Sequence, residues 1–211
     1  MDLQEEEPQF LLIARERLRP GNEEAYDKNE LQLATLCATL NCPHPYLALA
    51  TVAGPQEVWW LNAFASQEER DGLDASYASN EPLMAAMRPL GKRKEDFRES
   101  FTSTMTEFRR DLSGSALRIA GARFLVINAA SDGRVATGAV FQTADGRRFV
   151  IASANDRGIA EDLAARTGPG ATVLAVQPQW SFPAEAWIDA DPEFWQSSLV
   201  ARRPGTSRGA L

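Results

Sequence analysis

Long apolar runs, histidine and cysteine are all scarce in this chain, and each scarcity excludes a class of protein. No apolar stretch reaches the length of about 18 residues that a membrane-spanning helix needs, so we expect no membrane partnership. The two cysteines, Cys37 and Cys42, are too few for a disulfide framework, and their spacing is not that of a CxxC motif. His44 is the single histidine, so a protein-built zinc site would need other ligands, and we expect neither a metal nor a cofactor.

Positive charge is also limited, and it is unevenly placed. The net charge of −7 lies entirely in residues 1–110, whereas residues 111–211 are neutral, which fits two units of different composition. An acidic chain without a basic stripe is a poor partner for nucleic acid, because phosphate neutralisation supplies most of that affinity. The acidic start, MDLQEEEPQF, lacks the basic region of a signal peptide, so we predict a cytoplasmic protein.

Sequence motifs of the common enzyme classes are absent. The chain contains no GxSxG, no HExxH, no P-loop and no GxGxxG after a strand, which excludes the usual hydrolase, kinase and dehydrogenase classes. Asp191-Pro-Glu193 is better explained as the start of a last short helix than as a cation site, and we expect Trp187 and Trp195 to dock that segment on the domain. Cys37 is predicted to be in the core and Cys42 to be a free thiol.

Hydrophobic periodicity predicts the order β-α-β-β-α-β over residues 1–110. Strands are expected at 10–17, 46–52, 57–64 and within 101–109, with helices at 22–40, from Ser66 to Ala78, and from Asn80 onward. Ser66-Gln-Glu-Glu69 is a capping box that marks a helix start. This order is the ferredoxin-like unit, an antiparallel sheet with both helices on one face.

The remaining chain predicts a smaller unit. Residues 111–200 read as β-β-β-α-β, with Asp156 capping the helix, and residues 201–211 are expected to be a disordered tail. The predicted fold class is therefore α+β: a ferredoxin-like βαββαβ unit (1–110) plus a β-rich α+β unit (111–200), with sheets packed face to face.

The stretch EVWWLNAF, residues 57–64, requires cover on both faces of the first sheet. Neighbouring strand residues point to opposite faces, so Trp59 and Trp60 place a large ring on each side. One ring packs under the helices, and the other needs a second layer. A bare face with Trp60 and Phe64 would be the kind of apolar patch that marks an interaction surface.

EVWWLNAF followed by SQEERDGLDASYASNEPL resembles the dimeric α/β-barrel superfamily of ferredoxin-like proteins, over residues 8–110. Antibiotic-biosynthesis monooxygenases belong to that superfamily. The resemblance implies that two sheets close into a barrel whose enclosed space holds a small molecule. Activities there range from cofactor-free oxygenation, haem degradation and chlorite dismutation to simple binding. The second sheet comes either from a homodimer partner or from residues 117–180, as an intrachain pseudo-dimer.

Five residues are predicted to bind a ligand. We assign Trp60, Asn62 and Phe64 to the cavity side, because a buried amide needs a partner or a ligand. The resemblance implies that a Trp and an Asn hold an aromatic anion, while the alternative is an interface Trp and an Asn bonded to backbone. Arg15 either meets an anionic ligand or pairs with acids at the sheet edge. His44, in CPHPY, is a base or haem ligand if it faces the barrel, and otherwise an exposed loop residue.

Three functions remain open from the sequence. The first is a binder of a small apolar or aromatic molecule in a barrel-like cavity. The second is a cofactor-independent monooxygenase, so whether the chain is an enzyme is left undecided. The third is a structural or oligomerisation module without catalysis.

Overall fold

The structure is a computed structural model that describes residues 7–129 and 135–198. The first half of the chain supplies β1 (Phe10–Leu18), α1 (Glu23–Thr39), β2 (Leu47–Thr51), β3 (Glu57–Phe64), α2 (Gln67–Ala78), α3 (Glu81–Phe97) and β4 (Arg98–Phe108). The second half supplies β5 (Phe124–Asn128), β6 (Ala139–Gln142), β7 (Arg148–Ala154), α4 (Arg157–Thr167), β8 (Thr172–Val176) and α5 (Glu185–Ala190). The predicted α+β class is confirmed. The predicted tail, 201–211, lies outside the described residues.

Side-chain caps fix where two of the helices begin. The Ser66 hydroxyl accepts a hydrogen bond from the Glu69 amide at 3.1 Å, and the Glu69 carboxylate accepts from the Ala65 amide at 2.7 Å. The predicted capping box is therefore present, with its carboxylate reaching one residue beyond the cap. Asp156 caps α4 as predicted, because its carboxylate accepts from the Ile159 amide at 2.9 Å.

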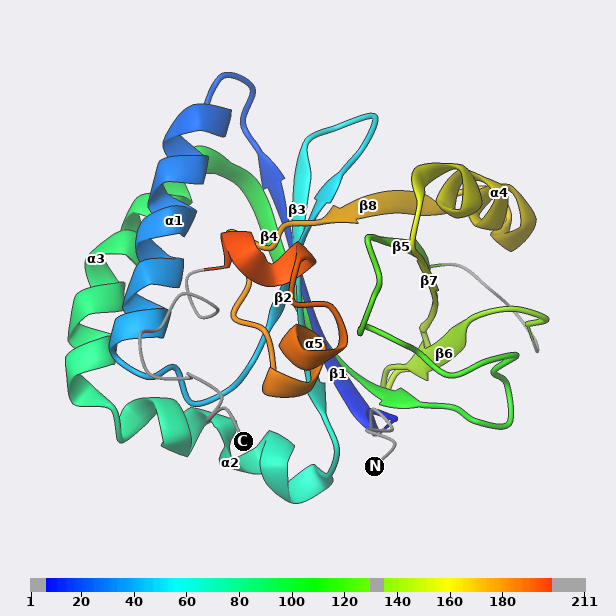
Figure 1. Ribbon diagram of the computed structural model, residues 1–211, viewed down its shortest axis with the longest axis horizontal. Coiled ribbons are helices and arrows are strands. Elements are labelled where there is room, and N and C mark those ends of the chain that lie inside the picture. Colours follow the sequence, from blue (N-terminus) through cyan, green and yellow to red (C-terminus); the bar gives the residue numbers. More distant parts are fainter. Residues whose placement is uncertain (1–6, 130–134, 199–211) are drawn as a thin grey trace, which may run out of the picture.

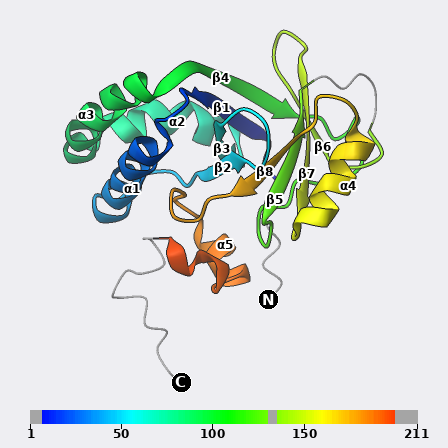
Figure 2. The ribbon, with the colours of Figure 1, turned by 90° about the horizontal axis from the view of Figure 1, so that it is seen from above.

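The eight strands form one closed barrel within a single chain. Their order is β1-β3-β2-β8-β5-β7-β6-β4, and β4 returns to β1. The halves join where β8 pairs with β2, and again where Glu107 and Phe108 at the end of β4 pair with β6. Figure 2 shows β4 crossing from the helices α1, α2 and α3 to the second group of strands. The expected second layer is thus present and comes from the same chain.

The helices lie outside this barrel. In Figure 1, α1 and α3 stand on one side of the sheet, and α4 lies on the far side against β5, β7 and β8. Strands from residues 1–110 and 111–200 belong to one continuous sheet. The division of the chain into two units at residue 110 stays a prediction.

The barrel interior is packed with apolar side chains. The inward positions of the strands are almost completely buried and carry Leu11, Ile13, Leu47, Leu49, Trp59, Leu61, Leu125, Ile127, Phe141, Ile151, Leu174 and Val176. An eight-stranded barrel is just wide enough for its inward side chains to fill it. The core of the protein is therefore the barrel interior.

Strand β3 faces the opposite way from the prediction. Trp59 and Leu61 point into the barrel core, whereas Trp60 packs with Leu18 and Tyr26 on the helix side. The assignment of Trp60, Asn62 and Phe64 to the barrel cavity is therefore wrong. The physical reason is the amide: Asn62 reaches the Pro45 carbonyl at 3.3 Å in the loop beneath the helices, while the interior positions are apolar.

The C-terminal segment docks on the barrel core through two tryptophans, as predicted. Trp187 and Trp195 are buried and stack with ring centroids 6.2 Å apart. Asp191 accepts from the Phe194 amide at 3.2 Å and so begins only a 3₁₀ turn, Phe194–Ser197. The helix α5 lies just before this turn and was not predicted from the sequence.

Cys37 and Cys42 are joined as a disulfide. The prediction of a free thiol at Cys42 is therefore wrong. The chain turns back after α1 through Asn41, whose φ of 57° lies in the left-handed region, and this brings the two Cα atoms to 4.5 Å. Cys37 is fully buried, as predicted.

Candidate functional site

Three of the five predicted ligand residues meet on the helix side of β3. His44 lies in the loop between α1 and β2, with its ring centroid 4.5 Å from that of Phe64. The Asn62 amide lies 3.5 Å from His44 Nδ1. Trp60 is further along the same face and meets the edge of Tyr46 at 5.7 Å. Arg15 points to the opposite face of the sheet and so belongs to a different place.

His44 is a buried histidine, not the exposed loop residue that the sequence also allowed. Only 5% of its surface is accessible. Its Nδ1 lies 2.7 Å from the Pro45 carbonyl, which accepts a hydrogen bond from that nitrogen, and the Asn62 amide donates to the same carbonyl. In the neutral ring, the tautomer that suits this contact carries its hydrogen on Nδ1 and has a lone pair on Nε2.

Glu69 faces that second nitrogen from the start of α2. Its Oε1 lies 3.2 Å from His44 Nε2, close enough for an ion pair when the imidazole is protonated. This contact is not a hydrogen bond, and Nε2 has no hydrogen-bond partner within the described part of the chain. Buried polar atoms are usually satisfied, which makes this nitrogen a group that a ligand would complete. The sequence had identified Glu69 only as a cap.

A hollow of about 460 Å³ opens beside this pair. It lies between the His44 loop and α2, and we call it the histidine hollow; it is lined by Pro43, His44, Ser66, Glu68, Glu69, Gly72, Leu73 and Ser76. Its size is that of a small-molecule site. Glu68 and Glu69 make it acidic, which disfavours an anionic ligand.

A cluster of charged side chains is buried nearby, between β1 and the helices α1 and α3. Glu16 accepts hydrogen bonds from the Tyr26 hydroxyl and from Arg98 Nη1 at 3.1 Å, and it forms an ion pair with Lys94 Nζ at 3.1 Å. Lys94 Nζ also lies 3.1 Å from Glu30, and it sits 4.6 Å above the Trp60 ring. We call these residues, Glu16, Tyr26, Glu30, Lys94 and Arg98, the buried charge cluster.

Burial perturbs two groups of this cluster. Loss of solvent raises the pKa of Glu30 to about 7, with the nearby Glu16 adding to the rise and Lys94 opposing it. Burial, reinforced by Glu30 and Glu16, raises the pKa of Tyr26 well above its usual range. Glu16 and Glu30 are each about 2% exposed. The two carboxylates are thus closed to solvent, and we assign the cluster to stability rather than to ligand binding.

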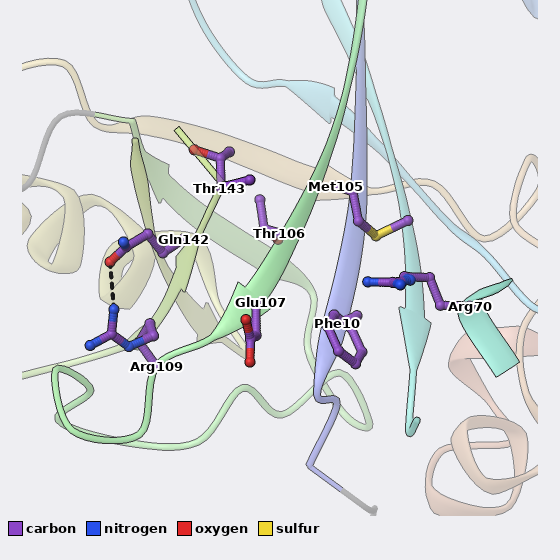
Figure 3. Close-up of a pocket in the computed structure, with 9 residues that line it drawn as sticks. Phe10, Arg70, Met105, Thr106, Glu107, Arg109, Gln142 and Thr143 are labelled. Atoms are coloured by element: carbon purple, nitrogen blue, oxygen red, sulfur yellow. Dashed lines mark hydrogen bonds between the residues drawn. The ribbon is translucent and has the colours of Figure 1, made fainter. Parts of the chain in front are cut away.

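A further hollow, of about 440 Å³, lies where β4 meets β6 (Figure 3). Both of its arginines already have partners. Arg109 donates hydrogen bonds to Gln142, at 2.9 Å, and to Asp111. Arg70 donates to Asp71 and lies over the Phe10 ring. This hollow therefore offers a ligand fewer free groups than the histidine hollow.

The described residues hold no group of three or more His, Cys, Asp and Glu close enough to bind a metal ion. Over residues 7–129 and 135–198, none of the helices has both the length and the apolar character needed to cross a membrane.

Solved structures match this chain over most of its length. An anthrone oxidase-like protein matches with a TM-score of 0.50 and 10% identity, over 82% of this chain and 92% of that one. A proposed monooxygenase from Fusobacterium nucleatum matches with a TM-score of 0.48 and 8% identity, over 81% and 93% of the two chains. A proposed chlorite dismutase matches with a TM-score of 0.47 and 9% identity, over 86% and 98%.

This chain has the dimeric α/β-barrel fold. The resemblance seen in the sequence is therefore confirmed at the level of the fold. No family model matches the chain, and no curated protein matches it. The fold is shared by proteins of several activities, so function has to be argued from the site itself.

Proposed function

We propose that this chain binds a small, largely apolar molecule that carries a hydrogen-bonding group, in the histidine hollow. The observation that carries the proposal is His44 Nε2, a buried nitrogen beside a hollow of ligand size and without a hydrogen-bond partner among the described residues. The sequence placed the ligand inside the barrel. The apolar side chains that occupy the barrel interior favour the outer site instead.

The lining sets the chemistry of the ligand. Pro43 and Leu73 offer apolar surface, while Glu68 and Glu69 accept hydrogen bonds. A neutral molecule with an O–H or N–H group, such as a hydroxylated aromatic, satisfies both. Asn62 acts on this site indirectly, because it holds the carbonyl that orients the His44 ring. A homodimer and a cytoplasmic location stay predictions.

Binding is expected to depend on His44. With 1-naphthol as the probe, we expect saturable binding by the wild type and a Kd about tenfold higher in His44→Phe, since one hydrogen bond to a ligand is worth about 1 kcal/mol or more. Phenylalanine keeps a ring against Phe64. Ser76→Trp should block the hollow, and Ala75→Trp, an exposed neighbour on α2, is the matched control. No saturable binding, or equal Kd values in wild type and His44→Phe, contradicts the proposal.

A second candidate is cofactor-independent oxygenation, and the His44 tautomer favours it. A base at Nε2 can take the acidic C–H proton of a bound anthrone. The carbanion then forms a C–O bond with molecular oxygen, the peroxide takes up the proton, and loss of water from this hydroperoxide gives the quinone. We expect oxygen uptake with anthrone that falls at least tenfold in His44→Phe and persists in Ala75→Trp. Uptake that is the same in wild type and His44→Phe rejects this candidate and leaves simple binding intact.

A further inference from the structure

A third hollow, of about 400 Å³, gathers three arginines from distant parts of the chain. Arg15 and Arg17 come from β1, and Arg157 comes from the first turn of α4. Glu57, Glu161 and Thr172 also line it. We propose that this arginine hollow binds a small molecule that carries phosphate or carboxylate groups.

Arg15 is held in place as part of the fold. Its Nε and Nη2 donate to the two Glu57 oxygens at 2.9 and 2.6 Å, and Glu57 is 5% exposed. The Trp59 indole donates to the same carboxylate at 3.2 Å. Its ring lies beneath the guanidinium, with the ring centroid 5.1 Å from Arg15 Cζ. Arg15 itself is about half exposed. The buried Glu57 thus orients the Arg15 guanidinium at the surface of the hollow. The Nη1 donors of Arg15 have no partner among the described residues.

Arg17 and Arg157 have only surface partners. Arg17 lies 3.4 Å from Glu99, and Arg157 donates to Glu161 at 2.7 Å; all four side chains are about half exposed. Exposed ion pairs of this kind contribute little, so a ligand can replace them at little cost. The planar fork of a guanidinium matches the oxygens of a carboxylate or a phosphate.

Each arginine of the hollow has one carboxylate partner, so an anion binds by replacing the exposed partners. Glu57 and Glu161 line the hollow and pair with Arg15 and Arg157, and Glu99 beside it pairs with Arg17, in a chain of net charge −7. The surrounding acidity disfavours a polyanion such as nucleic acid. The volume limits the occupant to a small molecule.

The test is calorimetric titration of the full chain at constant ionic strength, with inorganic phosphate and with citrate as separate probes. We expect at least one of them to bind saturably, and Arg17→Gln and Arg157→Gln each to raise its Kd roughly tenfold, the value of one charge-assisted hydrogen bond. Arg147→Gln is the matched control, because Arg147 is exposed and pairs with the exposed Asp145 elsewhere on the surface. Arg15 is left intact so that Glu57 stays paired.

Binding of phosphate alone or of citrate alone supports the proposal and identifies the anionic group. If neither probe binds saturably, or if Arg147→Gln weakens binding as much as Arg17→Gln does, the arginine hollow is no specific site. His44→Phe should leave this Kd unchanged, so failure here is separate from failure at the histidine hollow.

Discussion

Replacing Glu16 with glutamine is expected to lower the free energy of unfolding by about 3–5 kcal/mol. Glu16 lies at the centre of the buried charge cluster, where it accepts hydrogen bonds from Tyr26 and Arg98 and forms an ion pair with Lys94. Glutamine has nearly the same volume but no charge. Lys94 would then keep only Glu30 as a carboxylate partner, and Arg98 would lose its pair with Glu16. A largely buried charge that loses its partner is far more costly than a missing surface pair.

Urea unfolding followed by tryptophan fluorescence at pH 7 measures this loss. Glu24→Gln is the matched control, because Glu24 also pairs with a lysine, Lys28, at 2.6 Å, but both side chains are exposed. We expect no measurable loss there. Equal losses in the two variants would mean that burial does not decide the contribution of these pairs.

Local signals were enough to predict most of the fold. β3 was predicted at residues 57–64 and observed there, because its alternation and the turn before it are both strong. The capping box at Ser66 and the Asp156 cap fixed the starts of α2 and α4. The need for a second layer followed from Trp59 and Trp60 together. Closure within one chain could not be derived, since it depends on the long-range pairings of β8 with β2 and of β6 with β4.

The orientation of β3 could not be read from its sequence. Trp59 and Trp60 are adjacent, so each face of β3 carries a tryptophan together with other apolar residues. The alternation of side chains therefore does not show which face points into the barrel. The amide of Asn62 was taken as a sign of a ligand cavity. Its actual partner, the Pro45 carbonyl, lies 17 residues away in the chain, and a contact at that separation leaves no local signal.

One residue of the buried charge cluster, Glu30, is recognisable in the sequence by its position. Glu30 falls four residues after Tyr26 and three before Leu33, which places it on the apolar stripe of α1. A carboxylate on such a stripe needs a buried partner. That partner, Lys94, comes from α3. The sequence therefore indicates that Glu30 needs a buried partner but does not identify Lys94 as that partner.

Glu16→Gln is expected to lower the free energy of unfolding, whereas Glu30→Gln is expected to gain stability relative to the wild type as the pH rises. Burial raises the pKa of Glu30 from 4.5 to about 7, so the native state holds this proton more tightly than the unfolded chain. The resulting stabilisation is complete below pH 4.5 and is lost as the pH rises through 7. From this group alone, the wild type should lose about 2–3 kcal/mol between pH 5 and pH 8.

Glu30→Gln resembles the protonated side chain at every pH, so it should not share this decline. Unfolding free energies of wild type and Glu30→Gln, measured at pH 5, 6.5 and 8, should therefore diverge by about 2–3 kcal/mol, with the variant gaining on the wild type as the pH rises. Other titrating groups are common to both proteins and cancel in the difference. A difference that stays constant with pH would mean that Glu30 is already ionised in the native state at pH 5. Lys94 would then be shared by two buried carboxylates, and both Glu→Gln substitutions would destabilise the protein.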